Sequence, residues 1–304
     1  MALYKGNTAI SKVYLGSTQI QKIYLGSVLL YSGAKSYSEI IADGNTAGWY
    51  MPTDAANVTA VSGVESIWWD MMYGKLGTLG SEKSSGAIVL YAVYKITATT
   101  SNFFYTGCAV GDVFVCGTVK TCSATCKVQQ YLGNHITQSA AGNRPTNQVF
   151  NGTSSFMKIA AFTLNQPEFV YMVVKPIAFT GYGTWFDGNA NNTGNVLFAA
   201  SGSPNIYAAA PTASANNAHA SIGNYHIIRA LYNGASSKLI VDATTPTTWN
   251  CGTNNMGGFT LGKIGTAALY YGNIQVKEII IRKVSDTSDD EATLYNYLKS
   301  KYSL

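Results

Sequence analysis

The side chains best suited to hold a metal ion are five cysteines, four of which fall between residues 108 and 126. Zinc sites usually take ligands from close pairs that are separated by two residues. The spacings here are wider and irregular, and no histidine lies among the four. We therefore predict free thiols in a reducing compartment. The cysteines are Cys108, Cys116, Cys122, Cys126 and Cys251, and the histidines, which show neither ligand nor nucleophile spacing, are His135, His219 and His226.

One acidic segment has the pattern of a calcium loop. Oxygen-bearing side chains alternate at Asp187, Asn189 and Asn191, as they do where such a loop begins. The glycine at the sixth position and the closing glutamate of an EF-hand are missing. Runs of Asp, Asn and Gly also form ordinary turns. The three residues are therefore candidate calcium ligands, with a turn as the alternative, and no other cofactor is expected.

Tryptophans are the candidate contacts for a sugar, because an aromatic ring can stack on a sugar face. Trp185 and Trp249 lie in Gly- or Thr-rich, loop-like surroundings, where recognition residues concentrate. Trp68 and Trp69, followed by Asp70, form a second possible platform. The alternative for this pair is that at least one ring fills a core and that Asp70 caps a turn. Trp68, Trp185 and Trp249 are the candidate ligand-binding residues.

Glycoside hydrolysis needs two carboxyl groups in a set geometry. The chain has only 15 acidic residues, and no strand carries an array of closely spaced carboxylates. Glu278 stands alone in its expected strand. We therefore expect that the chain is not an enzyme, with a glycan depolymerase kept as an alternative.

The composition favours many short strands joined by tight turns. Hydrophobic residues make up 47% of the chain and charged residues only 12%, with 30 glycines and 21 tyrosines; soluble proteins average about 25% charged residues. The ample apolar content excludes disorder. The net charge of +5 comes from scattered basic residues, so a nucleic-acid surface is not expected.

No targeting or membrane segment is expected. The opening MALYKGNTAI lacks an apolar core of a signal peptide. No apolar run approaches the ~18 residues that span a bilayer. We expect a protein made in a cytoplasm, without a signal peptide and without membrane insertion.

A ten-residue unit occurs three times at the start of the chain, as LYKGNTAISK, VYLGSTQIQK and IYLGSVLLYS. In each copy, strand-forming residues flank a glycine that suits a turn, which predicts strand, turn, strand. Such a unit is too small to bury a face alone, so residues 1–35 are predicted to be an oligomerisation or docking arm. The alternative is a hairpin that packs on the next domain. The turn glycines are Gly6, Gly16 and Gly26, and the candidate docking residues are Tyr14, Leu15, Tyr24 and Leu25.

The segment VYLGSTQIQKIYLGSVLLYSG resembles the repeats that open many tail-fibre and other virion proteins of bacteriophages. The resemblance implies a particle-attached structural protein, located in the virion, whose partners are other virion proteins. A homotrimer is the expected assembly.

The rest of the chain reads as strands and turns followed by one helix. Apolar strands are predicted at residues 168–175, 225–232 and 274–282. Asn233-Gly234 between apolar runs predicts a hairpin, with its return strand at residues 238–241. Ser288, with Glu291 three residues later, predicts a capping box at the start of the helix; Leu294 and Leu298 would form its buried face.

This region is similar to the concanavalin A-like superfamily in its laminin-G-like form. The matching segments, in chain order, are residues 46–50, 64–70, 143–146, 150–153, 233–237, 276–281 and 297–302. The resemblance implies an all-β, jelly-roll β-sandwich with a short C-terminal helix, over residues 36–85 and 139–304. Residues 86–138 resemble a small β-module of phage structural proteins and are predicted to be an insertion.

These patterns together predict a bacteriophage virion structural protein. It would be a tail fibre, head fibre or capsid decoration whose sandwich attaches to the host surface, with a cell-surface glycan as the expected partner. The alternatives are a bacterial surface lectin module and a glycan depolymerase.

Overall fold

The computed structural model describes residues 4–5, 8–9, 13–15, 18–20, 22–25, 28–32, 35–61, 64–73, 78–100, 102–178, 182–200, 204–210, 213–217 and 220–304. These residues form two compact units. One contains residues Met1–Thr46 together with Asp286–Leu304, and the other contains Ala47–Ser285. Strands dominate both the order of elements and the core, so the predicted all-β class is confirmed.

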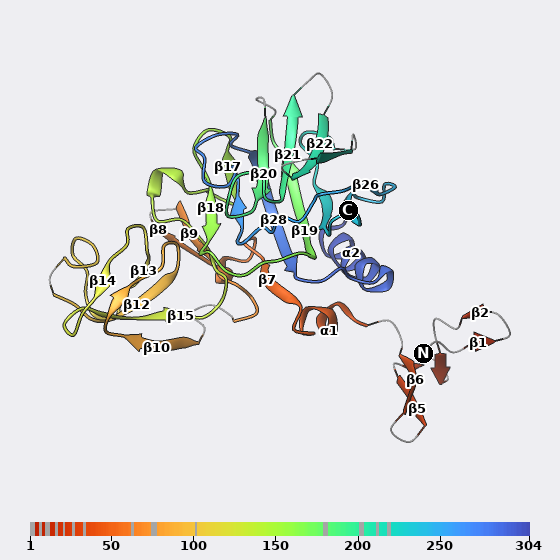
Figure 1. Cartoon of the computed structure of the whole chain (residues 1–304), viewed down its shortest axis with the longest axis horizontal. Helices are drawn as coiled ribbons and strands as arrows, with labels where there is room; N and C mark the ends of the chain where they lie inside the picture. Colours follow the sequence, from red (N-terminus) through yellow and green to blue (C-terminus); the bar gives the residue numbers. More distant parts are fainter. Residues whose placement is uncertain are drawn as a thin grey trace. The chain divides into compact units, whose positions relative to one another are not determined.

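The larger unit is built around two antiparallel sheets (Figure 1). Among the described residues, the first sheet has nine strands in the spatial order β23 (Ala213–Asn217), β22 (Pro204–Ala210), β21 (Asn195–Ala200), β20 (Gly183–Asp187), β27 (Thr260–Leu261), β18 (Met157–Ile159), β16 (Ile136–Thr137), β9 (Val64–Trp68) and β8 (Val58–Val61). The second has the order β17 (Val149–Asn151), β28 (Asn273–Arg282), β19 (Glu168–Pro176), β24 (His226–Tyr232), β25 (Ser237–Val241) and β26 (Thr247–Trp249), with β7 (Thr46–Tyr50) also paired to β28.

The two sheets share one hydrophobic core, which makes the unit a β-sandwich. Strand β19 shows why the sequence folds this way. Every residue from Phe169 to Val174 is fully buried, so both faces of the strand are covered and both are apolar. Within the sheet, β19 lies between β28 and β24, with Val170 opposite both Ile281 and Ala230. From the other sheet, Trp68 and Phe186 belong to the same buried cluster. The strands predicted at residues 168–175, 225–232, 238–241 and 274–282 are confirmed.

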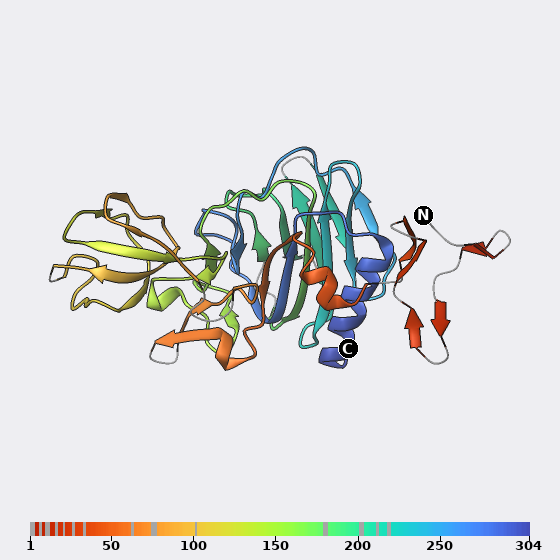
Figure 2. The same cartoon turned by 90° about the horizontal axis from the view of Figure 1, so that it is seen from below.

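A separate four-stranded sheet lies within the chain between two neighbouring strands of the sandwich. Its order is β10 (Leu79–Lys83), β15 (Lys127–Tyr131), β12 (Val93–Ala98) and β13 (Val113–Val115), accompanied by the short pair β11 (Gly86–Ala87) and β14 (Thr121–Cys122). The chain leaves the sandwich after β9 and returns at β16, and these two strands pair with Trp68 opposite Ile136. Figure 2 shows the inserted sheet in yellow beside the sandwich. It begins at Leu79, before the predicted boundary at residue 86; the domain boundaries stay predictions.

The inserted sheet has a hydrophobic cluster of its own. Ile96 and Val128 are fully buried in it, together with Tyr94 and Phe104. Four of the five cysteines belong to this cluster, and Cys251 belongs to the sandwich core. All five are buried and carry free thiols. The thiols therefore fill space between apolar side chains.

The smaller unit contains the repeats and two helices. Each repeat is a hairpin of two antiparallel strands, as predicted; the turn glycines Gly6, Gly16 and Gly26 lie outside the described residues. The pairs are β1 (Tyr4–Lys5) with β2 (Thr8–Ala9), β3 (Val13–Leu15) with β4 (Thr18–Ile20), and β5 (Lys22–Leu25) with β6 (Val28–Ser32).

The two helices of this unit, α1 (Tyr37–Ile41) and α2 (Ser288–Tyr302), contact each other. The rings of Tyr37 and Tyr297 stack with centroids 3.9 Å apart, and Lys35 Nζ lies 3.2 Å from Asp290 Oδ2. Helix α1 was not predicted from the sequence. The cap of α2 lies one residue before the predicted Ser288, because the hydroxyl of Thr287 accepts the N–H of Asp290.

No helix in the part of the chain that the structure describes combines the length and the apolar character needed to cross a bilayer.

Candidate functional site

The three tryptophans predicted to contact a sugar are buried. Trp68 has no exposed surface, Trp185 is 1% exposed and Trp249 is 8% exposed, and all three belong to the sandwich core. The prediction is therefore wrong for a physical reason. A register shift in β20 between Thr184 and Phe186 breaks the alternation of faces, so a segment with loop-like composition turns two successive rings inward.

Asp70 caps a turn, as the alternative reading of its segment predicted. Its carboxylate accepts the N–H groups of Trp49 and Met72 at 3.1 Å each, and that of Asn134 at 3.2 Å. Burial raises the pKa of Asp70, and these three backbone donors oppose the shift. The carboxylate therefore holds three segments of the chain together.

The Asp187 carboxylate faces backbone donors, an arrangement that does not suit a cation. It is fully buried and accepts N–H groups from Gly188, Asn192, Thr193, Gly194 and Gly265 at 2.8 to 3.3 Å. Burial raises its pKa to about 6, and the N–H groups oppose that rise. Calcium would have to compete with all of these donors for the same oxygens.

The other two predicted ligands are engaged in the same way. Asn191 Oδ1 accepts the backbone N–H groups of Thr266 and Ala267 at 2.8 and 3.0 Å. The ammonium group of Lys158 lies 3.5 Å from Asn189 Oδ1. A positive charge beside a cation site opposes binding, so these residues do not fit calcium. They form a hydrogen-bonded network, buried at Asp187 and exposed at Asn191, that fixes the loop after β20.

A serine, a histidine and an aspartate lie in one row, which sequence spacing did not reveal. His226 Nδ1 is 2.7 Å from Asp242 Oδ2, and His226 Nε2 is 3.3 Å from Ser221 Oγ. The order is that of a nucleophilic triad. However, Nε2 lies closer to the backbone nitrogen of Ser221, at 3.0 Å, and to its carbonyl oxygen, at 3.2 Å, so the backbone of the turn already engages this nitrogen. These hydrogen bonds therefore stabilise the turn before β24.

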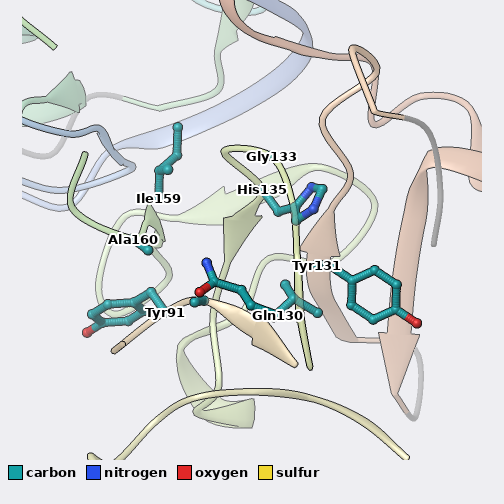
Figure 3. Close-up of a pocket in the computed structure, with 9 residues that line it drawn as sticks. Tyr91, Gln130, Tyr131, Gly133, His135, Ile159 and Ala160 are labelled. Atoms are coloured by element: carbon teal, nitrogen blue, oxygen red, sulfur yellow. The ribbon is translucent and has the colours of Figure 1, made fainter. Parts of the chain in front are cut away.

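Figure 3 shows a small cavity lined by Tyr91, Gln130 and His135, among others. Its volume of about 10 Å³ matches a single water molecule and is too small for a sugar. Burial lowers the pKa of His135 to about 4, so the ring is neutral at pH 7. The cavity is part of the packing between elements and offers no ligand site.

A much larger groove lies where the inserted sheet meets the sandwich, and its volume is about 610 Å³. That volume is within the range of about 300 to 1,000 Å³ that is typical of ligand sites. One side comes from β8 and β9, through Thr59, Ser66 and Ile67. The opposite side comes from β13 and the loops around it. The groove is therefore the candidate binding site.

The side formed by the inserted sheet is aromatic. Phe114 in β13 packs its ring against Phe104 and Tyr105, with centroids 5.3 and 5.9 Å apart. Phe104 is buried, whereas Tyr105 is 38% exposed. The Tyr105 hydroxyl donates to Asp112, which holds the ring in place. Burial raises the pKa of Tyr105, and the Asp112 carboxylate adds to that rise. A rigid aromatic surface thus faces the groove.

Hydroxyl groups and two cations complete the lining. Thr118 and Ser139 supply hydroxyls, while Lys120 and Arg144 supply positive charge. Arg144 is held by two backbone carbonyls, since its Nε donates to Gln138 at 2.8 Å and its Nη2 donates to Ser139 at 2.6 Å. These residues were not predicted from the sequence, because they come from six separate segments between residues 59 and 144. The run Phe103-Phe104-Tyr105 was the one visible signal.

Searches against protein-family models and curated proteins return no match. Solved structures do match. A sialidase from Trypanosoma rangeli covers 90% of this chain at 9% identity with a TM-score of 0.46, and the chain spans 34% of the sialidase. A GH54 α-L-arabinofuranosidase covers 86% of this chain at 11% identity with a TM-score of 0.46, and the chain spans 64% of the arabinofuranosidase. Domain 4 of the arabinanase AbnA from Geobacillus stearothermophilus, in complex with arabinotriose, covers 83% at 12% identity with a TM-score of 0.41, and 98% of it is spanned.

These matches correct one expectation. The sequence analysis expected that the chain is not an enzyme, but glycosidases are among the solved structures that it resembles. At this identity the likeness concerns the fold alone. The absence of a closely spaced carboxylate array within one strand was therefore too weak a reason to exclude an enzyme.

Proposed function

We propose that this protein binds carbohydrate in the groove between the sandwich and the inserted sheet. The observation that carries the proposal is the contrast between the two sides of the groove. The exposed ring of Tyr105 and the half-buried ring of Phe114 line one side, and the hydroxyl side chains of the sandwich strands line the other. A sugar has an apolar face of C–H groups and an edge of hydroxyls, and it would satisfy both sides at once.

The volume of the groove, about 610 Å³, supports an oligosaccharide rather than a single small metabolite. Ring stacking orients a ligand, and a small number of polar groups then selects among similar ligands. The groove has both kinds of group. A weak single site would suffice if several copies act together.

We propose further that the N-terminal arm attaches the chain to a bacteriophage virion. The proposed oligomeric state of the chain is a homotrimer. Three separate two-stranded hairpins support this, since a hairpin of this size needs a partner to be stable. A tail fibre, head fibre or capsid decoration would all use such an arm. A lectin on a bacterial surface would use the same groove.

The arm is tested by light scattering on the full chain and on a variant with Tyr14→Asp and Tyr24→Asp. We expect a trimer that becomes a monomer in the variant. If both chains are monomers, the trimer proposal is wrong. The remaining possibility is that the arm docks on another virion protein, and detecting the chain in purified particles tests it.

The groove is tested with the full chain on an array of bacterial surface polysaccharides and their oligosaccharides. We expect binding that falls at least about tenfold in Tyr105→Ala and in Phe114→Ala, as expected for central aromatic contacts. Tyr182→Ala is the matched control, because Tyr182 is 56% exposed and does not line the groove. The same samples are assayed for new reducing ends, which separates a lectin from a depolymerase.

Two outcomes would overturn the groove proposal. One is that the wild-type chain binds no sugar on the array. The other is that Tyr182→Ala loses as much affinity as Tyr105→Ala, while circular dichroism shows that both variants are folded.

A further inference from the structure

The charged lining of the groove has one sign. Lys120 and Arg144 line it, and no aspartate or glutamate is among its lining residues. Among the residues that the structure describes, neither cation has a carboxylate oxygen within 4.0 Å. Other lysines of the chain do have such partners, for example Lys127 with Glu82 at 3.0 Å. The groove therefore contains two positive charges without a neutralising group from the protein.

Arg144 is positioned in advance. The carbonyls of Gln138 and Ser139 accept from its Nε and Nη2, which fixes the plane of the guanidinium. Burial lowers the pKa of Arg144, yet an arginine stays charged in proteins. A guanidinium held in one orientation loses less freedom when it binds a carboxylate, and its planar donors match the two carboxylate oxygens.

We propose that the occupant of the groove is an acidic oligosaccharide whose sugar carboxylate pairs with Arg144 and Lys120. This inference rests on the carbohydrate-binding function proposed above and adds the class of sugar. The aromatic side holds the ring, as for any sugar, and the two cations select sugars that carry a carboxylate. Uronic and sialic acids share this chemistry.

The test compares an acidic oligosaccharide with its carboxyl-reduced, neutral counterpart by titration calorimetry on the full chain. Oligogalacturonate and a sialylated oligosaccharide serve as the two acidic probes, and they distinguish the two sources of carboxylate. We expect at least one acidic probe to bind about tenfold or more tightly than its reduced form. Raising the salt concentration should weaken binding of the acidic form only.

Variants assign the preference to the two cations. Arg144→Gln and Lys120→Gln should each lower affinity for the acidic probe and leave affinity for the neutral form unchanged. Arg144→Lys keeps the charge but loses the planar fork, so it should recover only part of the preference. Lys238→Gln is the control for net charge, since Lys238 lies in β25 and does not line the groove.

The outcomes separate the two proposals. Equal binding of acidic and neutral forms would overturn the acidic preference and leave carbohydrate binding in place. A preference that survives in both Gln variants would also overturn it. If no sugar of either kind binds, the carbohydrate function fails and this inference fails with it.

Discussion

Gly117 and Ser139 approach so closely that a β-carbon on Gly117 would stand 2.4 Å from Ser139 Oγ and 2.9 Å from Ser139 Cβ. The contact joins the loop after β13 to the loop after β16, and both residues line the groove. The two sides of the groove therefore meet at a position where a larger side chain does not fit.

Gly117→Ala should force these loops apart. We expect a loss of about 1 to 3 kcal/mol in the free energy of unfolding, as for other overpacked sites, and weaker sugar binding. Urea unfolding and calorimetry measure the two effects. Gly142→Ala is the control, because a β-carbon there meets nothing within 4 Å. The double variant Gly117→Ala with Ser139→Gly should recover most of the loss; no recovery would show that the close approach is not the cause.

Glu168 should make stability depend on pH. The side chain is fully buried, and burial raises its pKa to about 8 although Met256 donates its N–H to Oε1. Between pH of about 4.5 and 8 the folded state keeps a proton that the unfolded state releases. This group therefore lowers the free energy of unfolding by roughly 1.4 kcal/mol per pH unit as pH rises through that window.

Glu168→Gln should flatten that pH profile and raise stability at pH 8, because the amide stays neutral and still accepts from Met256. Urea unfolding at pH 5, 6.5 and 8 measures the slope. Glu82→Gln is the comparison, since hydrogen bonds from Thr97 and Lys127 lower the pKa of Glu82. If Glu168→Gln proves as steeply pH-dependent as wild type, the assignment is refuted.

The pair of His226 and Asp242 should change stability in the same direction as Glu168, because both folded-state pKa values are raised, but in a window that begins at a pH of about 6.5. Burial alone would lower the pKa of His226, but the hydrogen bond and charge of Asp242 outweigh it and raise the pKa. The pair therefore stabilises the folded state most below the unfolded pKa of about 6.5, and this contribution is lost as pH rises through the higher folded pKa.

Asp242→Asn should lower the pKa of His226, which an NMR titration of its ring protons measures. Asparagine tolerates the left-handed backbone at this position, where φ is 52°. The variant should also lose the extra stability below pH 6.5. An unchanged pKa would show that Asp242 does not hold the proton on this ring.

The buried tryptophans should affect stability and leave recognition unchanged. Trp249→Phe keeps a ring against Tyr232, which it contacts edge-on with centroids 5.6 Å apart. Trp185→Ala should lower the free energy of unfolding by about 3 to 5 kcal/mol, as for other aromatic deletions in a core. Sugar affinity of folded Trp249→Phe should equal that of wild type. If folded Trp249→Phe lost sugar affinity, the result would show that Trp249 contributes to the binding site.

Local sequence patterns predicted the strands, because the formation of a strand depends on residues that are close together in the sequence. The apolar run at Val170 marks a strand covered on both sides, and Asn233-Gly234 marks the hairpin between β24 and β25, where Gly234 has a φ of 51°. The site depends on residues that are distant in the chain. Asp187 looked like a calcium ligand because its donor Gly265 lies 78 residues away and leaves no trace in local spacing. Arg144 and Tyr105 meet at one groove for the same reason.

The inserted sheet leaves the sandwich after Trp68 and returns at Ile136, and these residues are opposite each other in paired strands. Its two ends therefore lie side by side, as in loops that accept foreign domains. One such sheet could be exchanged for another in evolution without changing the register of β9 and β16. Because that sheet supplies the aromatic half of the groove, exchange at this point offers a route by which related chains change the lining of the groove.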